Sequence, residues 1–152
     1  MRILHAADLH LDSAFAGLAE EKAALLRQES RDILRRMVDW ANDHAVDVML
    51  LSGDLFDSDR MYSQTARTLA QALARFRGRI FLSPGNHDFY APGSGYDAVD
   101  WPENVHFFTS RRPQTVLLRS LNASATGAAF TAAEEWEPFD GASFSGGDAP
   151  IR

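Results

Sequence analysis

The chain has 152 residues, no cysteine and a formal net charge of −6, with 45% hydrophobic and 24% charged residues. This length and composition predict one soluble domain with its own core, and exclude a disulfide framework or a thiolate metal site. No apolar run approaches the roughly 20 residues of a membrane span, and the amino terminus lacks a signal-peptide pattern, so we expect a cytoplasmic protein without membrane contact. The negative charge argues against a generic basic surface for nucleic acids, although bound cations would neutralise part of it.

Apolar runs and helical periods alternate in the first half of the chain. Residues 3–7 predict a strand whose continuous apolar character places it centrally in a sheet. Residues 20–44 repeat apolar side chains at helical spacing, with arginine and glutamate on the other side. A strand at 46–51, a helix with a buried stripe at 69–76 and a strand at 79–82 follow. This order predicts a parallel sheet with right-handed crossovers.

The second half of the chain carries weaker signals. Residues 90–102 form a loop rich in glycine and proline, and residues 105–108 and 115–118 are typical of short strands. Residues 123–130 are a further candidate strand. From 131 to 152 the sequence is rich in alanine, glycine, serine and acidic residues, without a countable period. We expect a weakly structured tail there.

A polar motif follows each of the first three predicted strands. The motifs are Asp8-Leu9-His10, Gly53-Asp54-Leu55-Phe56-Asp57 and Gly85-Asn86-His87-Asp88. The preference of turns for Asp, Asn and Gly explains any one motif, but poorly explains three with histidine in two of them. In open α/β sheets, ligands bind in the crevice beyond the carboxyl ends of the strands. The three motifs therefore predict one site built from three loops.

The residue types in these motifs suit divalent cations. Asp8 and His10 are separated by one residue, so extended backbone directs both side chains to one side, as two ligands of one cation require. The Asp54 carboxylate, after a glycine turn, can bridge two cations, and Asn86 offers an amide oxygen to the second. Two cations about 3.5–4 Å apart activate hydroxide for in-line attack on phosphorus. Oxygen and imidazole ligands without thiolate suit Mn, Mg, Fe or Zn.

The third motif also contains residues able to move protons. His87 is free to protonate the leaving oxygen or to donate to a phosphoryl oxygen. Asp88, beside it, is able to orient the imidazole, a role that carboxylates often take behind a working histidine. These two residues are the predicted catalytic pair.

Taken together, the three motifs resemble the first signature blocks of the calcineurin-like metallophosphoesterase superfamily. Residues 5–13, followed by Phe15 and Gly17-Leu18, narrow the resemblance to DNA repair exonucleases of the SbcD/YhaO type, and the similarity covers residues 1–130. The resemblance implies an α/β fold, a layered α/β/β/α sheet sandwich of the metallophosphoesterase type. It also implies two divalent metal ions, manganese foremost, with iron, zinc or magnesium as alternatives.

On the matching positions the resemblance assigns specific roles. It implies His87, facing the scissile phosphate, and Asp88 as the catalytic residues, and four metal ligands: Asp8, His10, Asp54 and Asn86. Asp8, His10 and Asp54 would serve the first metal, and Asp54 and Asn86 the second. Asp57 would hold its loop rather than touch metal.

The sequence departs from the superfamily pattern after the third motif. The superfamily supplies three further histidines, the last two in a Gly-His-x-His block, whereas only His106 follows His87 here. Because the first three motifs are intact, we expect residues 1–152 to be a metallophosphoesterase domain that is incomplete at its carboxy-terminal side. A degenerate member of the superfamily is the alternative.

The leading functional hypothesis is a two-metal phosphodiesterase, a DNA exonuclease of the double-strand-break repair type. Its expected partners are DNA, an SMC/Rad50-like ATPase subunit and a second copy of the chain. A phosphomonoesterase or cyclic-nucleotide phosphodiesterase of the same superfamily is the first alternative. A non-catalytic assembly domain that partners an ATPase is the second, and the missing histidines motivate it.

Other polar and aromatic residues have simpler interpretations. The arginines of the first helix are most simply a solvated helix face, interrupted by acids: Arg27, Arg31, Arg35 and Arg36. His5, in the middle of a predicted strand, and Trp40, in the first helix, are expected in the core.

Overall fold

The computed structural model describes residues 1–58 and 63–134. Its helices are α1 (Glu20–Asp43) and α2 (Ser63–Ala74), with a short 3-10 turn η1 (Arg119–Leu121). Its strands are β1 (Ile3–Ala6), β2 (Val48–Ser52), β3 (Arg79–Ser83), β4 (Val105–Phe107), β5 (Gln114–Leu118) and β6 (Ala123–Gly127). The predicted tail at 131–152 lies outside the described residues from position 135 onward. None of the described helices is long and apolar enough to cross a bilayer.

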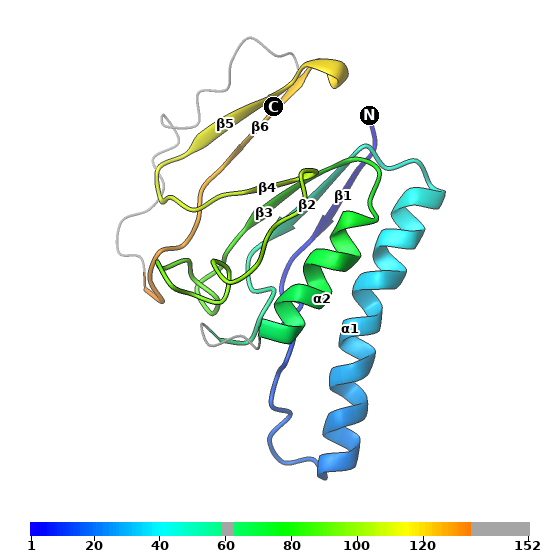
Figure 1. Cartoon of the computed structure of the whole chain (residues 1–152), viewed down its shortest axis with the longest axis vertical. Helices are drawn as coiled ribbons and strands as arrows, with labels where there is room; N and C mark the ends of the chain where they lie inside the picture. Colours follow the sequence, from blue (N-terminus) through cyan, green and yellow to red (C-terminus); the bar gives the residue numbers. More distant parts are fainter. Residues whose placement is uncertain (59–62, 135–152) are drawn as a thin grey trace.

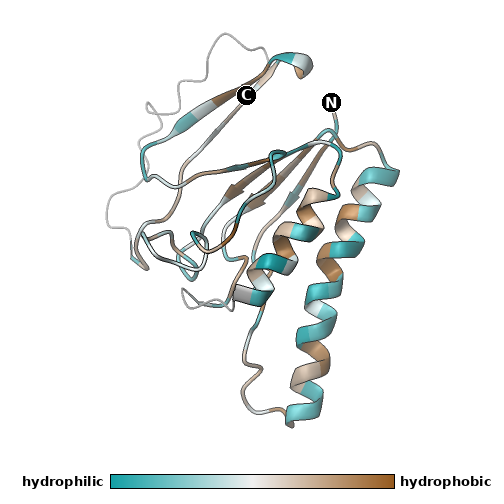
Figure 2. Cartoon of the chain, in the orientation of Figure 1, coloured by the Kyte–Doolittle hydropathy of each residue, from teal (hydrophilic) through white to brown (hydrophobic). Residues whose placement is uncertain are grey.

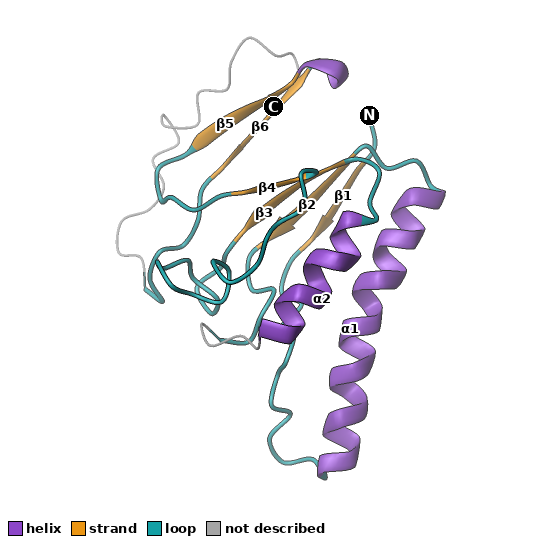
Figure 3. Ribbon diagram, in the orientation of Figure 1, coloured by secondary structure: helices purple, strands orange, loops and turns teal. Residues whose placement is uncertain are grey.

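The first four strands form one sheet in the order β1-β2-β3-β4, and every neighbouring pair is parallel. The alternation of strands and helices predicted this arrangement, which is confirmed. Both long helices cover one face of the sheet, as Figure 1 and Figure 3 show. The antiparallel β5–β6 hairpin lies toward the other face. The result is a helix, sheet and hairpin layering, an α/β fold of the predicted class.

The position of β1 differs from the sequence prediction. The strand pairs with β2 alone and lies at the edge of the sheet in the described residues, rather than at its centre. Ile3 is 51% exposed, and His5 is exposed as well rather than in the core. A run of only a few apolar residues is as typical of an edge strand as of a central strand. The sequence pattern therefore could not determine the position of β1 in the sheet.

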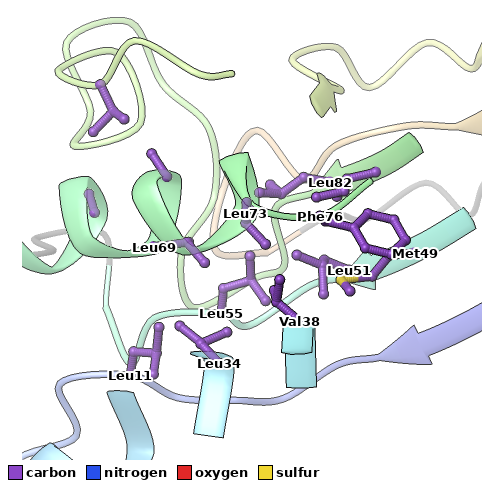
Figure 4. Packing of buried hydrophobic residues seen from close by; sticks show 14 of the residues in the cluster. Leu11, Leu34, Val38, Met49, Leu51, Leu55, Leu69, Leu73, Phe76 and Leu82 are labelled. Atoms are coloured by element: carbon purple, nitrogen blue, oxygen red, sulfur yellow. The ribbon is translucent and has the colours of Figure 1, made fainter. Parts of the chain in front are cut away.

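The main core lies between the sheet and the helices (Figure 4). Alternate residues of the two central strands face it, and α1 and α2 contribute residues at helical spacing. Its members include Leu34, Val38, Met49, Leu51, Leu69, Leu73, Ile80 and Leu82. Full burial of such a side chain contributes about 1.5–3 kcal/mol. In Figure 2 the strands are apolar. The helices alternate between polar and apolar surfaces.

Trp40 lies outside this core, contrary to expectation. Val38 and Ala41 occupy the inward positions of that turn of α1, so Trp40 falls on the outer surface and is 52% exposed. Its ring stacks on His44, with 4.0 Å between the ring centroids. The helical period therefore placed the neighbours of Trp40 correctly, and aromatic character alone was misleading.

A second, smaller core lies on the hairpin side of the sheet. Val48 and Phe81 pack there with Phe108 and with residues of β5 and β6. His106 of β4 belongs to the same face, with its ring 5.8 Å from that of Phe81 and 4.8 Å from that of Phe108. Burial, and secondarily the charge of Arg79, lowers the pKa of His106. His106 therefore packs among the aromatic rings of this smaller core.

Candidate metal centre

The loops that follow the strands remain hydrogen bonded to one another beyond the end of the sheet. The Asp8 amide donates to the Gly53 carbonyl at 3.1 Å, and the His10 amide donates to the Asp54 carbonyl at 3.0 Å. The Gly53 amide in turn donates to the carbonyl of Ser83 at 2.8 Å. These backbone bonds extend the parallel pairing into the loops. They bring the first and second predicted motifs side by side.

Three of the predicted metal ligands have left-handed backbone. Their φ angles are +55° for Asp8, +42° for His10 and +51° for Asp54, so the extended backbone expected at Asp8 and His10 is wrong. For a residue other than glycine this conformation costs about 1–2 kcal/mol. Such strain persists only where the surroundings impose it, and it clusters at functional sites. The interloop hydrogen bonds of these same residues provide that constraint.

The side chains of these residues meet. One ligand atom from each of Asp8, His10 and Asp54 lies within 4.8 Å of the others. A divalent cation holds nitrogen and oxygen ligands at about 2.0–2.6 Å, so ligands on opposite sides of it are up to about 4–5 Å apart. Two carboxylates and one imidazole within this span fit such a cation. The first predicted ligand set is therefore assembled by the fold.

Asn86 and Asp54 line one small pocket next to this cluster. The pocket has a volume of about 210 Å³ and is bordered by the ends of β2 and β3 and by Ala128 and Phe130. Asp54 thus faces both the cluster with Asp8 and His10 and the pocket with Asn86. A carboxylate in that position suits the bridging role predicted for it.

His87 lies beside the cluster. Its ring meets that of His10 edge-on at a centroid distance of 5.0 Å, and its side chain is exposed. Its backbone amide donates to Asp54 Oδ1 at 3.0 Å. An exposed imidazole next to the ligand atoms is accessible to a substrate held there.

Asp57 has a contact that the sequence did not predict. Its Oδ1 lies 3.0 Å from His10 Nδ1, and its backbone amide donates to the Leu11 carbonyl at 3.1 Å. A carboxylate that accepts the Nδ1 proton fixes the imidazole tautomer and leaves Nε2 for a metal. Asp57 contacts the loop after β1 and a predicted ligand, and its carboxylate also lies within 4.8 Å of ligand atoms of His10 and His87. The only hint of this contact in the sequence was that Asp57 lies three residues after the predicted ligand Asp54.

Asp88 is placed differently from its predicted role. The carboxylate is completely buried and accepts five hydrogen bonds, none of them from His87. The donors are the amides of Asp54, Leu55, Phe56 and Gly85 and the hydroxyl of Tyr96. A buried charge requires such complete pairing. Asp88 therefore holds loops together, and its expected positioning of the His87 ring is not what its contacts show.

Tyr96 was not singled out by the sequence, because a tyrosine in a loop carries no pattern. It is 1% exposed, and its hydroxyl donates to Asp88 Oδ2 at 2.5 Å. Burial, and then the charge of Asp88, raises the pKa of Tyr96 well above its ordinary value. The hydroxyl therefore stays protonated and keeps donating.

The arginines of α1 form no free basic surface. Each of the four is paired with an acid: Arg27 with Glu20, Arg31 with Asp12, Arg35 with Asp32 and Arg36 with Glu29. Three of them also line a cleft of about 1190 Å³ between α1 and α2, which Asp12 and Ala14 of the loop after β1 border as well. Their predicted role as a polar helix face agrees with this pairing.

A parallel sheet with carboxylate, imidazole and amide groups gathered beyond its strand ends fits a metal-binding hydrolase. The family model for calcineurin-like phosphoesterases matches residues 1–122. The chain belongs to this family, whose members are metal-dependent phosphoesterases.

Three curated proteins are similar to parts of this chain. The uncharacterized metallophosphoesterase YhaO of Bacillus subtilis is 36% identical over 120 residues, covering 75% of this chain and 29% of its own. The SbcD component of the nuclease SbcCD of Rhodobacter capsulatus is 34% identical, covering 58% of this chain and 22% of its own. The DNA double-strand break repair protein Mre11 of Methanopyrus kandleri is 23% identical, with 75% and 26% covered. The chain thus spans less than a third of the length of these relatives.

Proposed function

We propose that this chain carries part of a two-metal phosphodiesterase site that acts on DNA. The observation that supports it most directly is the position of Asp54, which faces both the cluster of Asp8 and His10 and the pocket of Asn86. Two of the relatives are named as a component of a nuclease and as a DNA double-strand break repair protein, which favours DNA over other phosphoesters. Association with an SMC/Rad50-like ATPase, formation of a homodimer and a cytoplasmic location belong to the same proposal.

The proposed roles follow from the positions of the side chains. Asp8, His10 and Asp54 would hold one divalent cation, and Asp54 and Asn86 a second, with manganese preferred. When bound, such cations supply Lewis-acid activation of water and neutralise charge on the phosphate. His87, exposed beside His10, donates a proton to the phosphoryl or leaving oxygen.

Hydrolysis assays test this proposal. The 152-residue chain is incubated with Mn²⁺ and linear duplex DNA, and in parallel with nitrophenyl phosphate mono- and diesters. DNA cleavage that is lost in Asp54→Asn and retained in Asp39→Asn, which alters an exposed ion pair of α1, would support the proposal. Intact DNA together with hydrolysed monoester would refute the DNA substrate.

A smaller phosphoester is the second candidate substrate, and one observation favours it. Because the arginines of α1 are all paired with acids, the described residues present no basic groove on that helix for a phosphate backbone. Cleavage of small phosphoesters without cleavage of DNA would support this candidate. Mn²⁺ binding without any hydrolysis would instead support an assembly role.

A further inference from the structure

Tyr96 is connected to the candidate metal centre through Asp88, which accepts hydrogen bonds from the Tyr96 hydroxyl and from the Asp54 amide. The residue belongs to the loop between β3 and β4, and its ring packs in an aromatic cluster. Its ring centroid is 5.7 Å from that of Phe56, 4.8 Å from that of Phe107 and 5.9 Å from that of Trp101. The cluster holds the ring in place, and the hydroxyl points at Asp88.

Asp88 connects two of the three site loops through its two oxygens. Oδ1 accepts the Gly85 amide at 2.6 Å and the Asp54 amide at 3.2 Å, so it joins the loop after β3 to the loop after β2. Oδ2 accepts the amides of Leu55 at 2.9 Å and Phe56 at 3.2 Å. The backbone around the predicted bridging ligand is therefore held by one buried carboxylate.

The loop after β1 is connected to the same group indirectly. The amide of His10 donates to the carbonyl of Asp54, and the amide of Leu11 donates to that of Leu55 at 2.8 Å. A shift of Asp88 would move the residues whose amides it binds, and through them the loop that presents His10. All three motifs thus depend on the position of a single carboxylate.

We propose that Tyr96 is a positioning residue of the metal centre, acting through Asp88. Its hydroxyl is the side-chain donor that completes the hydrogen bonding of Oδ2 and sets the orientation of the carboxylate. Without it, one oxygen of a buried charge loses a strong donor, and the carboxylate rotates or draws in water. The amides of Leu55 and Phe56 then lose their fixed acceptor, and Asp54 loses its left-handed geometry. This proposal rests on the proposed metal site.

The test compares two variants that each remove one tyrosine hydroxyl. Tyr96→Phe keeps the buried ring and removes the donor to Asp88. Tyr90→Phe is the matched control, because the Tyr90 hydroxyl donates to Asp97 at 3.0 Å in an exposed position. Mn²⁺ affinity is measured by titration calorimetry, the geometry around Mn²⁺ by its paramagnetic resonance spectrum, and amide exchange at Leu55 and Phe56 by NMR.

We expect Tyr96→Phe to weaken Mn²⁺ binding about tenfold, as the loss of supporting hydrogen bonds typically does. Its Mn²⁺ spectrum should change, and the amides of Leu55 and Phe56 should exchange faster, while Tyr90→Phe matches the original chain in all three measurements. Asp88→Asn, which keeps the shape of the side chain, should change them in the same direction as Tyr96→Phe.

Two results would overturn the proposal. One is a Tyr96→Phe variant that melts at a lower temperature but keeps its Mn²⁺ affinity and spectrum, because Tyr96 would then serve only folding. The other is equal amide exchange in the two tyrosine variants. If the original chain binds no Mn²⁺, the proposed function itself fails, and the exchange rates of Leu55 and Phe56 alone decide whether Tyr96 positions these loops.

Discussion

The core between the helices and the sheet and the loops beyond the strand ends are stabilised in different ways. The core consists of fully buried apolar side chains on regular helices and strands, such as Leu69 and Leu73. The loops have left-handed residues and are held by interloop backbone bonds and by the buried carboxylate of Asp88. Apolar packing is non-directional, whereas hydrogen bonds fix both distance and angle. Stability and metal-site geometry should therefore respond to different substitutions.

The largest effect on stability is expected in the core. Leu73→Ala removes a completely buried side chain of α2 and should lower the free energy of unfolding by about 2–5 kcal/mol. Mn²⁺ affinity, measured where the variant is still folded, should not change. Urea denaturation and titration calorimetry measure the two quantities. Leu117→Ala, at a 51% exposed position of β5, is the control and should have a small effect. Weakened Mn²⁺ binding in folded Leu73→Ala would contradict the separation of the two regions.

Gly85→Ala should affect both quantities. A Cβ at position 85 would fall on Oδ1 of Asp54 and lie 2.5 Å from its backbone nitrogen. Such overpacking costs about 1–3 kcal/mol, and the displaced Asp54 should bind Mn²⁺ poorly. Gly17→Ala is the control, because its φ is +96° but no atom lies within 4 Å of the added Cβ. It should lose some stability through backbone strain and keep Mn²⁺ affinity. Equal Mn²⁺ affinity in the two variants would disprove the steric argument.

Asp57→Ala should affect metal binding without much effect on stability. It removes the carboxylate that holds His10 Nδ1 at 3.0 Å, and loss of such a partner typically weakens metal binding about 10- to 100-fold. Calorimetric titration with Mn²⁺ measures the change. Asp32→Ala, which removes the partner of Arg35 on α1, is the matched control. An unchanged affinity in Asp57→Ala would show that the contact of Asp57 with His10 does not support metal binding.

The smallest effect is expected for Asp39→Asn. The ion pair between Asp39 and Arg75 joins α1 to α2 at 2.8 Å, but the two side chains are 45% and 55% exposed. Exposed pairs of this kind contribute about 0.2–1 kcal/mol, and salt screens them. Denaturation at low and high salt should show a small difference that shrinks with salt. A loss comparable to that of Leu73→Ala would mean that charge pairing, not apolar packing, joins the helices.

The elements of the fold were largely predictable, because each rests on a local pattern. The helical period of residues 20–44 and the apolar runs of β2 and β3 led to the observed elements and to a parallel sheet. Trp40 was placed wrongly because its aromatic character was given more weight than its position between Val38 and Ala41. The edge position of β1 depends on which strands flank it, and a single strand's sequence does not contain that information.

The sequence by itself determined which residue types stand at the ends of β1, β2 and β3, and hence that oxygen and imidazole groups meet there. Only the tertiary structure decided how these loops are held. Asp88 was assigned to its neighbour His87, yet it binds residues about thirty positions away and a tyrosine from a later loop. Adjacency along the chain does not specify where a buried carboxylate finds its donors, because those donors are brought together only when the strands pair.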